Sequence, residues 1–246
     1  CRRNSRGRRL SVLKVLASGS RGNCYLLITP DETLIIEAGI KYKEILKGLN
    51  YKIDKVVGCL VTHEHKDHSK SIKDLTENGI DVYSAKGTFE KLNIKNYRTK
   101  IVKANKRQQI GNFTILPFDV IHDAEEPLGF LIKHQDIGTL LFITDTCYCE
   151  YNFKNVNSIL VECNYIKENL EEYCIETSLS VRIKESHFEL ENVIDFLKAS
   201  DLSKTRNLML LHLSDKHGDS QIMKEKVEEA TGIPVLIAEK STEIIF

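Results

Sequence analysis

A chain of 246 residues can form one large α/β domain or two small ones, so its length leaves the domain count open. The composition, 41% hydrophobic and 28% charged, is that of an ordinary globular protein, and no apolar run approaches the ~18 residues of a membrane span. Because 35 basic residues balance 35 acidic ones, nucleic-acid binding would require a local basic patch. We therefore expect no membrane partner.

The first nine residues hold five arginines and begin with cysteine rather than methionine. They contain no apolar segment of the kind that a signal peptide needs. We expect residues 1–9 to be either a disordered basic tail or a remnant foreign to the natural protein. Residues 10–246 show no internal repeat, low-complexity tract or linker, which predicts a single domain.

Seven cysteines are scattered along the chain without the paired CxxC spacing of a structural zinc site. Their odd number favours free thiols in a reducing compartment, and hence a cytoplasmic location, over a disulfide framework. Cys147 and Cys149 follow shortly after Asp145, a candidate ligand. We expect both to be half-buried, small apolar residues rather than ligands.

Short apolar runs bounded by turn residues predict strands that alternate with helices along the chain. The predicted strands lie at 11–16, 24–28, 33–36, 56–61, 80–84, 112–117, 129–133, 139–143, 158–161, 207–211, 234–237 and 243–246. Amphipathic stretches predict helices at about 42–49, 69–78, 190–199 and 221–230. This order is typical of an α/β layered domain.

Three of the eight histidines fall within six positions, directly after the predicted strand 56–61, and an aspartate lies between them. An extended segment points residues i and i+2 to the same side, so His63 and His65 can chelate one ion. Asp67 and His68 are then free to face a second ion. A polar loop with incidental histidines is the alternative, and it would leave the downstream pattern unexplained.

Three further candidate ligands each stand just past a predicted strand: His122, Asp145 and His212. The ends of strands are where α/β layered folds assemble their sites. Mixed imidazole and carboxylate donors suit Zn²⁺ or Mn²⁺.

This order of ligands resembles that of the metallo-β-lactamase superfamily over nearly the whole chain. The resemblance implies an αββα four-layer sandwich that binds two divalent metal ions. It implies one ion on His63, His65 and His122, a second on Asp67, His68 and His212, and Asp145 between them. An aspartate at the bridging position matches hydrolases of phosphate esters and thioesters better than the zinc β-lactamases. Where the family has Asp-x-Gly, with the aspartate hydrogen-bonded behind the ligands, this chain has Glu37-Ala38-Gly39. The sequence leaves open whether the longer Glu37 side chain makes that hydrogen bond.

Three segments are similar to motifs of the YycJ/WalJ-type exonucleases. Ser18-Gly19-Ser20-Arg21-Gly22-Asn23 matches Ser-x-Ser-x-Gly-Asn, Glu162-Cys163-Asn164 resembles Glu-Ser-Asn, and His212-Leu213-Ser214 matches His-Leu-Ser. A glycine-rich tight turn is the alternative explanation of the first segment. The resemblance implies substrate contacts at Ser18, Ser20, Asn23 and Asn164.

The segment from Arg182 to His187 stands where that family has an arginine followed by Gly-His-Leu-Ser, and the match is looser. The resemblance implies a phosphate contact at Arg182, for which a solvated helix face is the alternative. It makes His187 a histidine that lies near the metals without binding them and that protonates the leaving alkoxide. The candidate catalytic residues are Asp67 and His187.

Only 42 positions separate Asp145 from His187, too few for the β-CASP domain of ribonuclease J and its relatives. The substrate platform then comes from the core domain. Seven cations between positions 91 and 107 would contribute to it, unless they form a solvated surface loop. His134, at a predicted hairpin turn, is expected to be exposed.

The leading hypothesis is a DNA exonuclease that digests single- or double-stranded DNA from the 5′ end, by family resemblance, in repair or recombination. The alternative is a small-molecule hydrolase of the same fold, either a cyclic-nucleotide phosphodiesterase or a thioesterase or lactonase, because the fold supports all of these. A non-catalytic binding module stabilised by metal would require a missing ligand, and none of the seven is missing.

Overall fold

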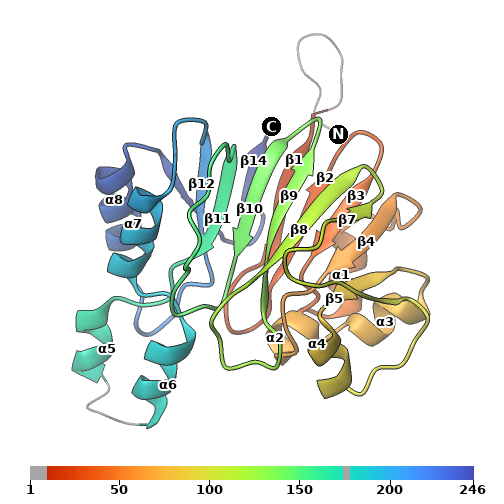
Figure 1. The fold of residues 1–246 in the computed structure, drawn as a ribbon, viewed down its shortest axis with the longest axis horizontal. Coiled ribbons are helices and arrows are strands. Elements are labelled where there is room, and N and C mark those ends of the chain that lie inside the picture. The colour runs from red at the N-terminus through yellow and green to blue at the C-terminus, as the bar shows by residue number, and fades with distance from the viewer. Residues whose placement is uncertain (1–9, 174–177) are drawn as a thin grey trace.

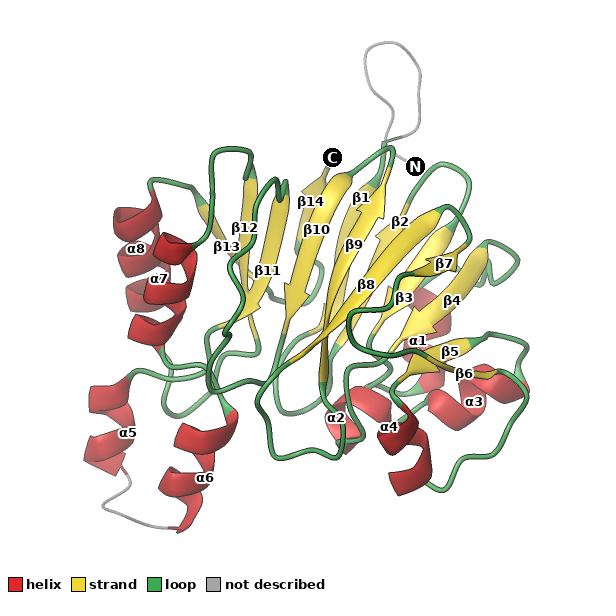
Figure 2. Ribbon diagram, viewed as in Figure 1, coloured by secondary structure: helices red, strands yellow, loops and turns green. Residues whose placement is uncertain are grey.

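The computed structural model describes residues 10–173 and 178–246, so the predicted basic tail, 1–9, lies outside the described residues. Two seven-stranded sheets stack face to face, and helices cover their outer faces (Figures 1 and 2). This arrangement confirms the predicted αββα sandwich.

The first sheet combines an antiparallel meander with a parallel half. Its strand order is β14-β1-β2-β3-β4-β5-β6. The bounds are β1 Val12–Ala17, β2 Cys24–Ile28, β3 Thr33–Ile36, β4 Val56–Leu60, β5 Val82–Ser84, β6 Thr99–Ile101 and β14 Glu243–Ile245. Strands β3 to β6 run parallel, so their carboxyl ends meet at one edge of the sheet.

The second sheet has the order β13-β12-β11-β10-β9-β8-β7. The bounds are β7 Gln108–Ile110, β8 Phe113–Asp119, β9 Leu128–His134, β10 Gly138–Ile143, β11 Ser158–Glu162, β12 Asn207–Leu211 and β13 Val235–Ile237. Strands β10 to β13 are parallel, and their carboxyl ends lie at the edge shared with the first sheet (Figure 1).

Apolar side chains from both sheets fill the space between them. Tyr25, Phe113, Phe130 and Phe142 are the largest members of this cluster, and all four are fully buried. The Tyr25 and Phe142 rings meet edge to face, with centroids 5.4 Å apart. This core joins the two sheets. The carboxyl ends of their parallel strands therefore lie together at one end of the sandwich, which we call the shared edge.

The helices have the bounds α1 Tyr42–Gly48, α2 Lys66–Ser69, α3 Ile72–Glu77, α4 Lys86–Lys91, α5 Lys167–Tyr173, α6 Ser178–Ser186, α7 Leu190–Ala199 and α8 Ser220–Thr231. Residues of α1 and α3 pack on the first sheet, and residues of α7 and α8 pack on the second. The side chain of Asp219 caps the start of α8, which ends at Gly232 in the left-handed conformation. None of the described helices has both the length and the apolar character needed to cross a membrane.

The structure refines several predictions from the sequence. The predicted helix 69–78 corresponds to α3. The short elements α2, β6, β7, α4, α5 and α6 were not predicted, because a few residues carry too little periodicity. The prediction that His134 is exposed is wrong: it is 4% exposed, because the ring of Phe113 and the side chain of Glu32 cover it. The described cysteines are free thiols, as expected; Cys147 is half-buried and Cys149 is buried.

Candidate metal centre

The seven predicted ligand residues lie on segments that leave β4, β8, β10 and β12 at the shared edge of the two sheets, and on α2. They fall into two groups, each within 4.8 Å between possible ligand atoms. One group is His63, His65 and His122, and the other is Asp67, His68, Asp145 and His212. This division matches the one that the family resemblance implies, except that Asp145, expected between the ions, falls in the second group.

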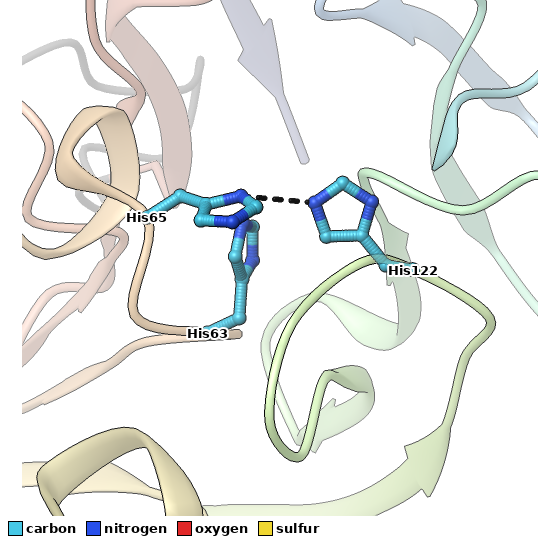
Figure 3. Close-up of side chains that lie close together, drawn as sticks. All are labelled: His63, His65 and His122. Atoms are coloured by element: carbon cyan, nitrogen blue, oxygen red, sulfur yellow. Dashed lines mark hydrogen bonds between the residues drawn. The ribbon is translucent and has the colours of Figure 1, made fainter. Parts of the chain in front are cut away.

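The first group consists of three imidazoles that face one another (Figure 3). His65 Nδ1 and His122 Nε2 are 3.1 Å apart. The other nitrogens of two of these rings are held from behind: His63 Nδ1 lies 2.9 Å from Thr62 Oγ1, and His122 Nδ1 lies 2.7 Å from the Ser186 carbonyl oxygen. Such contacts fix the ring orientation of metal-binding histidines.

The second group is organised around the Asp145 carboxylate. Asp145 Oδ2 lies 3.2 Å from His68 Nε2, and Asp67 Oδ2 lies 3.4 Å from the same nitrogen. The same Asp145 oxygen is 3.9 Å from His63 Nε2 and 3.7 Å from His122 Nε2. Asp145 therefore lies between the two groups, as a bridging ligand would.

Buried nitrogens that lack a hydrogen-bond partner indicate whether these residues fit metal ions. His63 Nε2 and His212 Nε2 are buried and accept or donate no hydrogen bond among the described residues. A buried polar atom without a partner costs about 1–3 kcal/mol, and native proteins keep few of them. A divalent cation in each group would satisfy these lone pairs, so the donor set fits two ions.

The pKa of His63 in the first group, and that of Asp145 between the groups, also suit ligation. Burial lowers the pKa of His63 well below its usual range, and the neighbouring His68 adds to this effect. His63 is therefore neutral and keeps a lone pair for a metal. Burial alone would raise the pKa of Asp145, but His212 and His68 outweigh it and hold that pKa well below its usual range.

Three residues at this edge adopt the left-handed backbone conformation that non-glycine residues rarely use. They are Glu37 after β3, Asp145 after β10 and His212 after β12, with φ angles of 66°, 46° and 52°. Each such conformation costs on the order of 1 kcal/mol and persists only where the surroundings impose it. The sharp turn directs each side chain off its strand and into the centre.

Glu37 reaches the ligands despite the departure from the family's Asp-x-Gly. Its Oε2 lies 3.4 Å from His68 Nδ1, and its Oε1 accepts a hydrogen bond from Thr62 N at 3.2 Å. Gly39 is required for a different reason: a Cβ atom there would lie 1.6 Å from the Asp67 carbonyl oxygen. The Glu37–Gly39 segment thus supports both His68 and Asp67.

Most of the predicted substrate contacts lie behind the ligands. Asn23 is fully buried, and its Nδ2 lies 3.1 Å from His68 Nε2 and 3.3 Å from the Asp67 carbonyl oxygen. Ser18 Oγ accepts a hydrogen bond from His212 N at 2.9 Å, and Asn164 Nδ2 donates to the His212 carbonyl at 2.8 Å. These three side chains anchor the segments that carry the ligands.

The other two predicted substrate contacts are on the surface. Ser20 is exposed on the turn between β1 and β2. Arg182, on α6, donates from Nε to Asp123 Oδ2 at 2.7 Å, beside the candidate ligand His122. This ion pair ties α6 to the loop after β8.

Glu162 is a candidate site residue that the sequence did not single out, although it begins the Glu-x-Asn motif. It is fully buried, and its Oε1 lies 2.7 Å from His187 Nδ1 and 2.9 Å from His212 Nδ1. Its Oε2 accepts hydrogen bonds from Thr146 N and Phe188 N at 3.0 and 3.2 Å. One carboxylate therefore orients a candidate ligand and the candidate catalytic histidine together.

His187 is partly exposed beside the two groups. Its ring centroid lies 5.6 Å from that of His122 and 5.5 Å from that of His212, and 21% of its side chain is exposed. Burial would lower the pKa of His187, but the Glu162 carboxylate outweighs burial and raises that pKa. Its Nδ1 is held by Glu162, so Nε2 is the nitrogen available to a substrate.

Comparisons with known proteins show what the chain is similar to. The family model described as the beta-lactamase superfamily domain matches residues 40–213. Exodeoxyribonuclease YycJ of Bacillus anthracis is 30% identical over 230 residues, 87% of each chain. Exodeoxyribonuclease WalJ of Streptococcus pneumoniae is 28% identical over 225 residues, 85% of this chain and 83% of WalJ. The metallo-β-lactamase fold protein YhfI of Bacillus subtilis superposes with a TM-score of 0.74 at 17% identity, covering 97% of this chain and all of YhfI.

Proposed function

The chain belongs to the metallo-β-lactamase superfamily and is a metal-dependent hydrolase, and from this premise we propose that it is a binuclear phosphodiesterase acting as a DNA exonuclease. The observation that carries the proposal is the position of Asp145 between two groups of histidines, with the Glu162–His187 pair beside them. The names of the relatives YycJ and WalJ support DNA as the substrate, and family resemblance supports digestion from the 5′ end in repair or recombination.

The proposal gives each part of the centre a role. His63, His65 and His122 would hold one divalent ion, Zn²⁺ or Mn²⁺; Asp67, His68 and His212 would hold the other, and Asp145 would contact both. When bound, such ions lower the pKa of a water molecule and neutralise the charge that develops on the phosphoryl oxygens. Asp67 is the most exposed candidate ligand of its group, with 24% of its side chain exposed, which fits its predicted catalytic role.

His187 would supply the proton that the leaving alkoxide needs. The carboxylate of Glu162 holds its Nδ1 and raises the pKa of the ring, so the protonated form persists toward neutral pH. Its Nε2 can then donate a proton to the leaving oxygen. Because Glu162 also contacts His212 Nδ1, the proton donor and the metal ligand keep a fixed relative position.

End-labelled DNA tests this function directly. The protein is stripped with a chelator, reloaded with Mn²⁺ or Zn²⁺, and incubated with linear single- and double-stranded DNA labelled at either end. We expect mononucleotide release from linear DNA only in the reloaded protein, with early release of the 5′ label. Closed circular DNA should remain intact, because an exonuclease needs a free end.

Two variants control the assay, and two outcomes contradict the proposal. Asp145→Asn should abolish digestion, whereas Glu32→Gln, which alters a buried carboxylate outside the centre, should retain it. Cleavage of circular DNA would contradict an exonuclease. Turnover of cyclic nucleotides or S-acyl glutathione without release of nucleotides from DNA would establish the small-molecule hydrolase instead.

A further inference from the structure

Three large apolar side chains remain exposed on the segments that surround the metal centre. Ile121 is 45% exposed and precedes the ligand His122, and Tyr148 is 48% exposed and lies three positions after Asp145. Val181, on α6, is 50% exposed and precedes Arg182, which pairs with Asp123. We call Ile121, Tyr148 and Val181 the apolar rim.

The backbone beneath Ile121 and Tyr148 is held by hydrogen bonds between the two loops. Cys147 N donates to the Ile121 carbonyl at 3.0 Å, and Ile121 N donates to Thr146 Oγ1 at 3.0 Å. Thr146 Oγ1 donates in turn to the Tyr148 carbonyl at 2.6 Å. These hydrogen bonds hold the loop that carries the exposed Tyr148 side chain against the loop that carries Ile121.

Helix α6 adds Val181 to the same region. The Ser186 carbonyl oxygen at the end of α6 lies 2.7 Å from His122 Nδ1, and Arg182 donates from Nε to Asp123 Oδ2 at 2.7 Å. These contacts hold α6 against the loop after β8, which carries Ile121.

The chemistry of the apolar rim selects a nucleobase as its occupant. The metal centre beside it suits a phosphodiester, whose nearest apolar neighbours are the bases on either side. Aromatic side chains bind bases by stacking, without preference for sequence. We propose that Tyr148, flanked by Ile121 and Val181, stacks on the base of the nucleotide whose phosphate enters the metal centre; this inference rests on the proposed function.

The test compares a substrate that has bases with one that has none. The substrates are a single-stranded oligonucleotide and an oligomer of abasic deoxyribose phosphates, and the variants are Tyr148→Ala, Tyr148→Trp and the control Tyr51→Ala, whose tyrosine is 64% exposed after α1. For Tyr148→Ala we expect the ratio of kcat/KM on the oligonucleotide to kcat/KM on the abasic oligomer to fall about tenfold. Tyr148→Trp and Tyr51→Ala should keep the wild-type ratio.

An oligonucleotide with abasic nucleotides at its ends provides the decisive comparison. On this substrate the wild type and Tyr148→Ala should have equal kcat/KM, because the stacking partner is gone. An unchanged ratio in Tyr148→Ala, or an undiminished difference on the abasic substrate, would overturn the stacking proposal while leaving the phosphodiesterase intact. A metal-loaded wild type that cleaves neither phosphodiester would overturn the proposed function itself, and the stacking proposal with it.

Discussion

The two ends of the sandwich each bury a histidine beside a carboxylate, but only one end resembles a metal centre. At the far end, Glu32 precedes β3 and His134 ends β9, with Nε2 and Oε1 3.5 Å apart. The oxygens of Glu32 accept hydrogen bonds from Asn112 N and Nδ2 at 2.8 and 3.3 Å. His134 Nδ1 accepts from Asp136 N at 3.1 Å, so this cluster satisfies itself.

At the metal end, the same residue types leave hydrogen-bonding capacity unused. His63 Nε2 and His212 Nε2, which face the carboxylates of Asp145 and Asp67, are buried and have no hydrogen-bond partner among the described residues. Three residues there also adopt left-handed backbone conformations. The comparison teaches that burial of a histidine does not indicate a ligand; buried nitrogens that converge without partners do.

The largest expected effect comes from removing the carboxylate between the two groups. In Asp145→Asn, His68 and His212 lose the anion that offsets their burial, and both metals lose a shared ligand. We expect metal analysis to show loss of bound metal and phosphodiester hydrolysis to fall by about a thousandfold. The matched Glu32→Gln variant should keep both. A fully loaded, active Asp145→Asn would show that the two groups do not share Asp145.

A smaller loss is expected from filling the space beneath Asp67. In Gly39→Ala, the added methyl overlaps the Asp67 carbonyl oxygen, which must shift and carry Asp67 with it. We expect a free energy of unfolding lower by about 3 kcal/mol, measured by urea denaturation, together with weaker metal binding. In the control Gly79→Ala, the added methyl meets open space, but the φ of +89° is strained for alanine. This variant should lower the free energy of unfolding by about 1 kcal/mol and leave metal binding unchanged. Equal losses in the two variants would contradict the role given to Gly39.

Glu162→Gln tests whether one carboxylate serves both a ligand and the proton donor. Glu162 raises the pKa of His187, so its removal lowers that pKa. If protonated His187 is the acid, the alkaline limb of the pH–rate profile moves to lower pH, and hydrolysis at neutral pH falls about tenfold. Loss of activity at every pH with an unmoved alkaline limb would leave Glu162 with a purely structural role.

The smallest effect is expected at the far end. His134→Gln removes a buried ring that packs on Phe113 with centroids 4.6 Å apart. We expect the free energy of unfolding to fall by about 1 kcal/mol and Tm by about 3 °C, with metal content and hydrolysis unchanged. A change in bound metal in this variant would break the distinction between the two ends.

The metal centre was largely predictable because its signals are local. The spacing of His63, His65, Asp67 and His68 lies within one segment, and His122 and His212 follow apolar runs that are recognisable as strands. The order of the main strands and of the long helices was predictable for the same reason. Elements of three residues, such as β6 and β7, were not, because they show too little alternation.

The residues that support the centre were decided by the tertiary structure. Ser18 Oγ binds the amide of His212 across 194 positions, and Asn23 lies against His68 across 45. Glu162 joins His187 to His212, and the burial of His134 depends on a turn a hundred positions earlier in the chain. Sequence by itself determines which residues can bind metal, because ligand chemistry and local spacing are written along the chain. Only the packing of the two sheets decides which buried groups find partners, since those partners come from segments far apart in sequence.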